Sequence, residues 1–247
     1  METYSLTDIG VTREMNQDYF FTSEEPVGNL PNLFIVADGM GGQNAGEFAS
    51  RYTVETIVKT VSESEKKDAV SILEEAISSA NSYLLEHARE NEGMAGMGTT
   101  IVAATVKGSE LSVANVGDSR LYIAGKEMRQ ITKDHSLVQE MVRMGELDAE
   151  KAKSHPDKNI ITRAIGAQEN VKVDFFEVAL KPGEKVMMCT DGLTNMLEDT
   201  ELFAILSEPG KNLAEKVEKM VNMANQNGGK DNITVVVFQP ISDEVAE

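Results

Sequence analysis

Apolar residues along the chain follow two periods, one typical of strands and one typical of helices. Short apolar or β-branched runs, and strict alternation of apolar and polar residues, predict strands. We expect strands at residues 3–10, 19–21, 34–37, 99–106, 110–116, 120–124, 128–131, 171–179, 185–190 and 233–238. Tight turns rather than crossover helices join the strands of the 99–131 block, which favours antiparallel pairing.

Other stretches repeat apolar residues every three or four positions, as one face of a helix does. The predicted helices cover residues 45–62, 68–90, 136–145, 200–206 and 213–225. Ser136 with Gln139, and Asn212 with Glu215, have the spacing of helix-capping pairs. These helices must cover sheet faces. We therefore expect one α+β domain of layered antiparallel sheets with covering helices and no linker.

Two of the apolar runs end in the same dipeptide, Asp-Gly. They are residues 34–39 (FIVADG) and residues 186–192 (VMMCTDG). A buried strand followed directly by glycine marks a turn. Asp38 and Asp191 are therefore predicted to lie at strand tips, held by a core and facing a loop.

Two more acidic residues lie in similar settings, Asp118 in VGDSR and Asp231 in GKDN. Mg²⁺ and Mn²⁺ take oxygen ligands, keep several waters and need few carboxylates per ion. Ordinary turn chemistry explains any single Asp-Gly pair about as well, because Asp favours turns and Gly tolerates positive φ. Four such acids at strand ends favour a metal site, to which Gly39 would add its carbonyl oxygen.

The early loop at residues 13–18 (REMNQD) combines Arg13 with Asp18. A guanidinium holds a phosphate through two parallel hydrogen bonds, although an isolated loop arginine is more often a surface residue. The Gly-rich loop at 39–47 fits neither GxxxxGK[ST] nor GxGxxG, which excludes those two nucleotide-binding motifs.

Composition narrows the possible functions. The chain has 247 residues, 41% of them hydrophobic, which supplies a sizeable core. Its 23 basic and 41 acidic residues give a formal charge of −18, which argues against a nucleic-acid surface. One cysteine excludes an internal disulfide framework. Without a signal-like segment or a run of 18 apolar residues, we expect a cytoplasmic protein that does not associate with membranes.

The histidine and cysteine side chains, which can act in catalysis or bind metals, are expected to have structural roles here. His87 lies on the apolar face of its helix and is predicted to pack there. His135 and His155 flank a polar insertion beside the core and are expected to be ordinary polar residues. Cys189 lies inside an apolar strand with no base near it in sequence, so we expect a buried structural thiol rather than a nucleophile.

With these motifs assembled, the chain closely resembles the bacterial branch of the metal-dependent serine/threonine protein phosphatases, the protein phosphatase 2C-like family. Each motif is modest alone, but the ordered set is highly specific and spans nearly the whole chain. The matching motifs are RxxNQD at 13–18, VADGMGG at 36–42, GTT at 98–100, VGDSR at 116–120, CTDGLT at 189–194 and GKDNIT at 229–234.

The resemblance implies a four-layer αββα sandwich, in which two antiparallel sheets are flanked by helices. It implies one phosphatase domain over residues 1–241, with a flap subdomain inserted at about 136–166. The family's flap lies beside the active-site cleft and is thought to influence substrate choice. We expect residues 242–247 to form a flexible tail.

The resemblance also implies a binuclear Mn²⁺ or Mg²⁺ centre in the cleft where the sheets meet. Asp38 would bridge the two ions, and Gly39 would offer its carbonyl oxygen. Asp191 and Asp231 would complete the protein ligands of the first ion. Asp18 would act near the second ion, directly or through water.

Two further roles are implied by the resemblance. Asp118, together with Asp191, would hold a third ion of the kind seen in bacterial relatives, so the centre would contain two or three ions. Arg13 would bind the phosphate. Water activated by the metal would attack phosphorus in line, so no protein nucleophile is required.

The chain departs from the family pattern at three positions. Met40 stands where eukaryotic relatives carry His, which excludes a histidine general acid there. Gln17 occupies a place where many relatives have Glu, which removes a ligand charge near the second ion. Gln43 stands where many bacterial relatives have His, and we assign it no consequence. None of the three removes a principal ligand.

The implied activity is hydrolysis of phosphoserine and phosphothreonine in proteins, by a monomer that opposes a bacterial serine/threonine protein kinase. Two alternatives stay open. A catalytically silent binding module with the same fold would be favoured by loss of Asp38, Asp191 or Asp231, and all three are present. A phosphatase dedicated to one regulatory phosphoprotein is not separable from a broader one by sequence.

Overall fold

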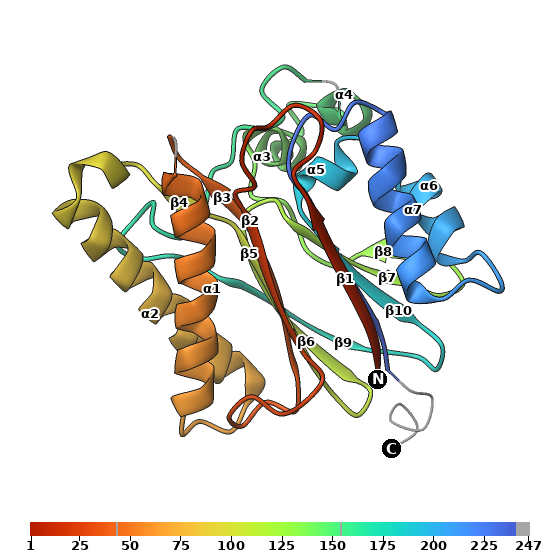
Figure 1. Ribbon diagram of the computed structural model, residues 1–247, viewed down its shortest axis with the longest axis horizontal. Coiled ribbons are helices and arrows are strands. Elements are labelled where there is room, and N and C mark those ends of the chain that lie inside the picture. The colour runs from red at the N-terminus through yellow and green to blue at the C-terminus, as the bar shows by residue number, and fades with distance from the viewer. Residues whose placement is uncertain (43, 154, 241–247) are drawn as a thin grey trace.

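The computed structural model describes residues 1–42, 44–153 and 155–240 of the chain. In it two antiparallel β-sheets pack face to face, and helices cover the outer face of each sheet (Figure 1). The predicted four-layer αββα sandwich is therefore confirmed. The predicted extent of one domain over residues 1–241 stays a prediction, and the predicted tail at 242–247 lies outside the described residues.

One sheet joins the two ends of the described chain. It contains β1 (Glu2–Asp8), β7 (Arg120–Ala124), β8 (Met128–Gln130), β10 (Lys185–Cys189) and β11 (Ile233–Gln239). Their spatial order is β1-β11-β10-β7-β8, and every neighbouring pair is antiparallel. We call this the β1–β11 sheet.

The other sheet, which we call the β2–β3 sheet, is built mainly from the first half of the chain. It contains β2 (Asp18–Ser23), β3 (Leu33–Met40), β4 (Gly98–Thr99), β5 (Ile101–Lys107), β6 (Glu110–Val116) and β9 (Asp174–Ala179). The order is β2-β3-β5-β6-β9, with β4 paired to the end of β3, and all pairs are again antiparallel.

Helices close the outer faces. The long helices α1 (Ala45–Glu63) and α2 (Ala69–Glu90) cover the β2–β3 sheet, whereas α6 (Asp199–Leu206) and α7 (Leu213–Gln226) cover the β1–β11 sheet (Figure 1). The shorter helical segments are η1 (Glu92–Met94), α3 (Leu137–Met144), α4 (Ala149–Lys153) and α5 (Asp191–Thr194).

Strand periodicity divides the apolar residues of β3 between two cores. Leu33, Ile35 and Ala37 pack against α1 and α2, while Phe34 and Val36 point into the interface between the sheets. Successive strand residues face opposite sides, so a strand covered on both sides is apolar throughout. This explains why the 34–37 run shows no polar alternation.

The interface between the sheets is anchored by two aromatic rings. Phe34 from the β2–β3 sheet stacks on Phe238 from the β1–β11 sheet, with ring centroids 4.0 Å apart and planes inclined by 13°. Both side chains are fully buried. Aromatic side chains bury large apolar areas, so this pair contributes strongly to holding the sheets together.

The predicted element boundaries agree closely with the structure at the helices. Helix α1 ends one residue beyond its predicted range, and the predicted capping residues Ser136 and Asn212 accept hydrogen bonds from the backbone N–H groups of Gln139 and Glu215. Helices α4 and α5 were not predicted, because neither is long enough to show a helical period.

One expectation about β3 was wrong. Asp38 does not lie at the tip of a strand, because β3 continues through Met40. The extension forms because Gly39 and Met40 pair with Thr99 and Gly98 of β4. Asp38 is therefore held in a strand with neighbours on both sides, which fixes it more firmly than a loop would.

No helix among the described residues is both long enough and apolar enough to span a membrane.

Truncating the aromatic pair should weaken the whole sandwich. We expect Phe34→Ala to lower the free energy of unfolding by about 3–5 kcal/mol, because it removes a buried ring and leaves a cavity between the sheets. Urea denaturation would measure this loss. Phe203→Ala, at a half-buried ring on α6, is the control and should cost less. Equal losses for the two variants would contradict the role given to the stacked pair.

Candidate metal centre

A layer of polar residues caps one end of the apolar interface between the sheets. Asp38 has the same strand parity as Phe34 and Val36, so its side chain continues their face toward the other sheet. By the same parity, Asp18 follows the face of Phe20. Thr7, Thr100, Ser119, Thr190 and Thr234 extend the layer by the same rule.

Asp18 is held by both sheets. It is 6% exposed and lies directly opposite Asp38 in the β2–β3 ladder. Its Oδ2 accepts hydrogen bonds from the hydroxyls of Thr190 (2.8 Å) and Thr234 (2.7 Å), which belong to the β10 and β11 side of the sandwich. Its Oδ1 is buried and has no hydrogen-bond partner among the described residues.

The backbone around Asp38 is fixed by two threonines. The Asp38 N–H donates to Thr100 Oγ1 (3.0 Å), and the Asp38 carbonyl accepts from Thr100 N–H (2.9 Å) and Thr99 Oγ1 (2.8 Å). Gly39 follows in a crowded position, where an added Cβ would overlap the carbonyl oxygen of Gly46. Only glycine therefore allows the strand to approach the start of α1 so closely.

Asp191 opens the short helix α5 directly after β10. Its Oδ2 accepts a hydrogen bond from Asn195 Nδ2 (2.9 Å), and its Oδ1 is buried without a partner among the described residues. Lys158, from the segment predicted to be a flap, donates to Asn195 Oδ1 (2.8 Å). A cavity of about 330 Å³ lies beside these groups, lined also by Asp118 and Asp134.

Asp118 lies on the turn between β6 and β7. Gly117 before it has φ of +107°, a conformation that side-chain-bearing residues rarely adopt, and an added Cβ would press on Thr100. His135 holds this turn in place, because its ring Nδ1 accepts from the Gly117 N–H (3.0 Å) while its backbone N–H donates to the Gly117 carbonyl (2.9 Å).

Asp231 and Arg13 meet at the open side of the layer. Arg13 Nη2 donates to Asp231 Oδ2 at 2.7 Å, and the two side chains are 49% and 34% exposed. The loop that carries Arg13 is tied down by Asn232, whose Nδ2 donates to the carbonyls of Ile9 and Met15 (both 2.9 Å). The structure thus places Arg13 next to the acids.

Burial and mutual repulsion raise the pKa values of four of these acids. Burial raises the pKa of Asp18 to about 7, with the charges of Asp191 and Asp231 adding to the effect against the two threonine hydrogen bonds. The pKa of Asp118 is raised to about 7 and that of Asp191 to about 6, mainly by burial. The pKa of Asp38 is raised well above its ordinary value by burial and by repulsion from Asp18, Asp191, Asp118 and Asp231.

These acids have the donor chemistry of a hard divalent cation site. Within the described residues no group of three or more His, Cys, Asp or Glu side chains is arranged so that it could by itself hold a metal ion. Mg²⁺ and Mn²⁺ do not require one, because they keep several waters and take one or two carboxylates each. The unpartnered oxygens of Asp18 and Asp191, with the crowding of negative charge at Asp38, fit a group of positive charge.

Sequence reasoning missed several residues that organise this end of the sandwich. His135 was wrongly expected to be an ordinary polar residue, since it is 7% exposed and its Nε2 lies 3.2 Å from Asp174 Oδ2 and 2.9 Å from Arg163 Nη1. Thr190 and Thr234 were not singled out. The alternation of side chains along a strand could have identified both threonines, because each lies on the same strand face as the apolar residues two and four positions away.

Two other predictions about side chains are confirmed. Cys189 is fully buried, and burial raises the pKa of its thiol to about 12, so it is not a nucleophile. His87 packs by stacking on Phe48, with ring centroids 4.4 Å apart. Gln43, one of the departures from the family pattern, lies outside the described residues.

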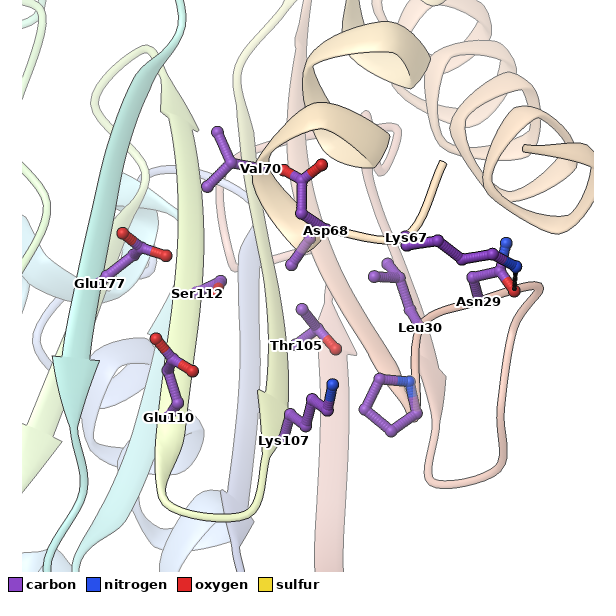
Figure 2. Close-up of a pocket in the computed structure, with 12 residues that line it drawn as sticks. Asn29, Leu30, Lys67, Asp68, Val70, Thr105, Lys107, Glu110, Ser112 and Glu177 are labelled. Atoms are coloured by element: carbon purple, nitrogen blue, oxygen red, sulfur yellow. Dashed lines mark hydrogen bonds between the residues drawn. The ribbon is translucent and has the colours of Figure 1, made fainter. Parts of the chain in front are cut away.

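A second pocket lies at the opposite end of the β2–β3 sheet. Figure 2 shows it between the loop before β3, the start of α2 and the far ends of β5 and β6. Its volume is about 260 Å³, and its lining alternates cationic Lys67 and Lys107 with anionic Asp68, Glu110 and Glu177. Mixed charges without buried unpartnered groups give this pocket no metal-binding character.

Comparison with known proteins gives the family. The family described as Protein phosphatase 2C matches residues 11–236. The serine/threonine phosphatase Stp of Listeria monocytogenes is 40% identical in an alignment of 238 positions, which covers 94% of this chain and 93% of that protein. The chain belongs to the protein phosphatase 2C family, a class of metal-dependent phosphoprotein phosphatases, so the predicted family and enzyme class are confirmed.

Solved structures agree with this assignment. The serine/threonine phosphatase of S. agalactiae has a TM-score of 0.89 and 38% identity, covering 97% of this chain and 99% of its own. The catalytic domain of the serine/threonine protein phosphatase PstP, in complex with two manganese ions, has a TM-score of 0.84 and 30% identity, covering 96% of each chain.

The raised pKa values predict how the metal-free protein responds to pH. Between the ordinary value of 3.8 and the folded values of about 6 to 7, the folded chain binds more protons than the unfolded chain. The contribution of these acids to the free energy of unfolding therefore falls as pH rises through this window and levels off above it. We expect EDTA-treated protein to melt at a lower temperature at pH 8 than at pH 5.5.

Added Mn²⁺ should reverse this trend, because metal binding favours the deprotonated carboxylates. Asp118→Asn removes one titrating group and should flatten the pH dependence of the metal-free protein. Thermal melts followed by circular dichroism would measure both effects. A metal-free melting temperature that rises steadily from pH 5.5 to 8 would contradict the raised pKa values.

Proposed function

We propose that the chain hydrolyses phosphoserine and phosphothreonine in proteins at a centre of two Mn²⁺ or Mg²⁺ ions. Asp38, Gly39, Asp191 and Asp231 would hold the ions together with Asp18. Asp118 and Asp191 would share a third ion. When bound, such ions lower the pKa of a water molecule and neutralise charge on the attacking and leaving oxygens of an in-line displacement.

The observation that carries this proposal is the pair of buried, unpartnered carboxylate oxygens, Asp18 Oδ1 and Asp191 Oδ1. A buried polar atom without a partner is costly, and each such atom needs an explanation. Both oxygens belong to acids that repel Asp38. A divalent cation would satisfy the oxygens and relieve the repulsion at once.

The chain's own groups complete the chemistry. Arg13 supplies a fixed positive charge and a planar fork of donors for the phosphate, and an open hollow of about 650 Å³ lies beside it. The hollow is lined also by Glu14, Met15 and Asn44. Cys189 is excluded as a nucleophile by its burial, which supports direct attack by water.

Support for manganese comes from the PstP catalytic domain, which is described in complex with two manganese ions. We further propose that the enzyme works as a cytoplasmic monomer and opposes a cognate serine/threonine protein kinase. Residues 136–166 would act as a flap within a single domain. Lys158, which reaches Asn195 beside Asp191, supports the placement of this segment next to the centre.

The alternative of a catalytically silent module is disfavoured, because no principal acid is lost and the oxygens of Asp18 and Asp191 lack other partners among the described residues. Dedication to one regulatory phosphoprotein is the second candidate. A panel of phosphopeptides and intact phosphoproteins would separate it from a broader specificity.

Removing a ligand acid should abolish catalysis. We expect Asp38→Ala and Asp191→Ala to eliminate Mn²⁺-dependent hydrolysis of p-nitrophenyl phosphate and of a phosphothreonine peptide. Glu74→Ala, at an exposed acid on α2, is the control and should keep wild-type activity. EDTA should abolish hydrolysis by the wild-type protein. Full activity in folded, Mn²⁺-supplied Asp38→Ala protein would eliminate the two-ion mechanism.

Arg13→Ala should act mainly on substrate binding. Loss of the guanidinium removes a charge-assisted contact to phosphate, so KM for the phosphothreonine peptide should rise by about 10-fold or more, with a smaller change in kcat. Arg89→Ala, which breaks an exposed ion pair with Glu169, is the control. Steady-state kinetics would measure both constants. KM and kcat that both match the wild type would show that Arg13 does not bind the substrate phosphate.

A further inference from the structure

The two threonine hydroxyls that contact Asp18 come from the opposite sheet. Thr190 follows β10 and Thr234 lies in β11, and both side chains are fully buried. Each donates to the same oxygen of Asp18, at 2.8 and 2.7 Å. The carboxylate is therefore held asymmetrically, with Oδ2 saturated and Oδ1 left without a partner among the described residues.

The hydrogen-bond partners leave each hydroxyl one role. The Thr190 hydroxyl accepts from the Thr234 N–H (3.0 Å), so its own proton is free to go to Asp18. An amide NH₂ can only donate, so Asn16 Nδ2 donates to Thr7 Oγ1 (2.8 Å). The Thr7 hydroxyl then donates to Thr234 Oγ1 (2.7 Å), and Thr234 donates to Asp18.

The chain of donors closes on itself. The Asp18 N–H donates to Asn16 Oδ1 at 3.1 Å, so the backbone of Asp18 fixes the amide whose other end begins the chain. Asn16, Thr7, Thr234 and Asp18 thus form a closed ring of hydrogen bonds, and Thr190 adds a second donor from outside it. Such a ring orients the carboxylate more strictly than one contact would.

From this arrangement we propose that Thr190 and Thr234 are positioning residues, which hold Oδ2 of Asp18 so that Oδ1 alone is left to interact with the divalent cation centre. The inference rests on the proposed two-ion centre and assigns these residues a part in it. Hydrogen bonds to ligating carboxylates orient them and tune their affinity for metal. Asp18 would then act at the metal centre through this one oxygen.

Isosteric substitution tests the proposal. Thr234→Val and Thr190→Val keep the shape of the side chain and remove the hydroxyl donor. In metal-stripped protein titrated with Mn²⁺ by calorimetry, each variant should bind Mn²⁺ roughly 10- to 100-fold more weakly than the wild type. Thr234→Ser and Thr190→Ser retain the hydroxyl and should restore the wild-type affinity.

A control separates positioning from general damage. Thr105 is a buried threonine at the other end of β5, where its hydroxyl donates to the carbonyl of Asn32 (2.8 Å). Thr105→Val should leave Mn²⁺ affinity unchanged. Thr190→Val also deprives the Thr234 N–H of its acceptor, so metal-free melting temperatures of all variants should be measured alongside.

The decisive comparison is made in an Asp18→Asn background. If the hydroxyls act through Asp18, adding Thr234→Val to Asp18→Asn should cause no further loss of Mn²⁺ affinity. A loss of the same size in both backgrounds, or wild-type affinity in folded Thr234→Val protein, would overturn the proposal. If Thr190→Val does not fold, the Thr234 variants and their serine counterparts still decide the outcome.

The proposed function is judged separately. Wild-type protein that fails to hydrolyse a phosphothreonine peptide with Mn²⁺ would refute the phosphatase proposal itself. Active wild type, inactive Asp38→Ala and normal Mn²⁺ affinity in the threonine-to-valine variants would leave that proposal standing and refute only the positioning role.

Discussion

The placement of Asp18 and Asp38 opposite each other, at the end of the interface between the sheets, is the constraint on which this structure depends. Two carboxylates opposite each other in one ladder repel each other, and the burial of Asp18 with the partial burial of Asp38 reduces the screening of this repulsion. Hydroxyls from the other sheet stabilise one oxygen of Asp18. Among the described residues, the hydrogen bonds at Asp38 involve neutral groups of Thr99 and Thr100, so a bound cation would offset the repulsion between the carboxylates.

The fold brings these groups together by ordinary strand geometry. Because β2 and β3 are neighbours in one sheet, Asp18 and Asp38 lie side by side. Because β10 and β11 are neighbours in the other, Thr190 and Thr234 do the same. Further along the same interface, Phe34 stacks on Phe238 and so holds the two sheets together. The apolar interface and the polar layer beside it are thus formed largely by successive residues of the same strand faces, which brings together residues far apart in the chain.

Most of the elements and most of the acids were predictable from the sequence, because long periods and Asp-Gly motifs are local signals. The continuation of β3 past Asp38 was not, because it depends on pairing with β4, some 60 positions further along the chain. His135 was misjudged for the same reason, since its importance comes from contacts with Gly117, Arg163 and Asp174. Partners far away in the sequence decide such features, and a single sequence does not state them.

The central claim, that the acids at the end of the interface form a divalent cation centre, is tested most directly by anomalous diffraction at the manganese absorption edge from crystals grown with Mn²⁺. We expect at least two anomalous peaks at the polar end of the interface, within coordination distance of Asp38 and Asp191 Oδ1 and beside Asp18 Oδ1. Crystals with no manganese peak at these carboxylates, under conditions that support hydrolysis of a phosphothreonine peptide, would contradict it.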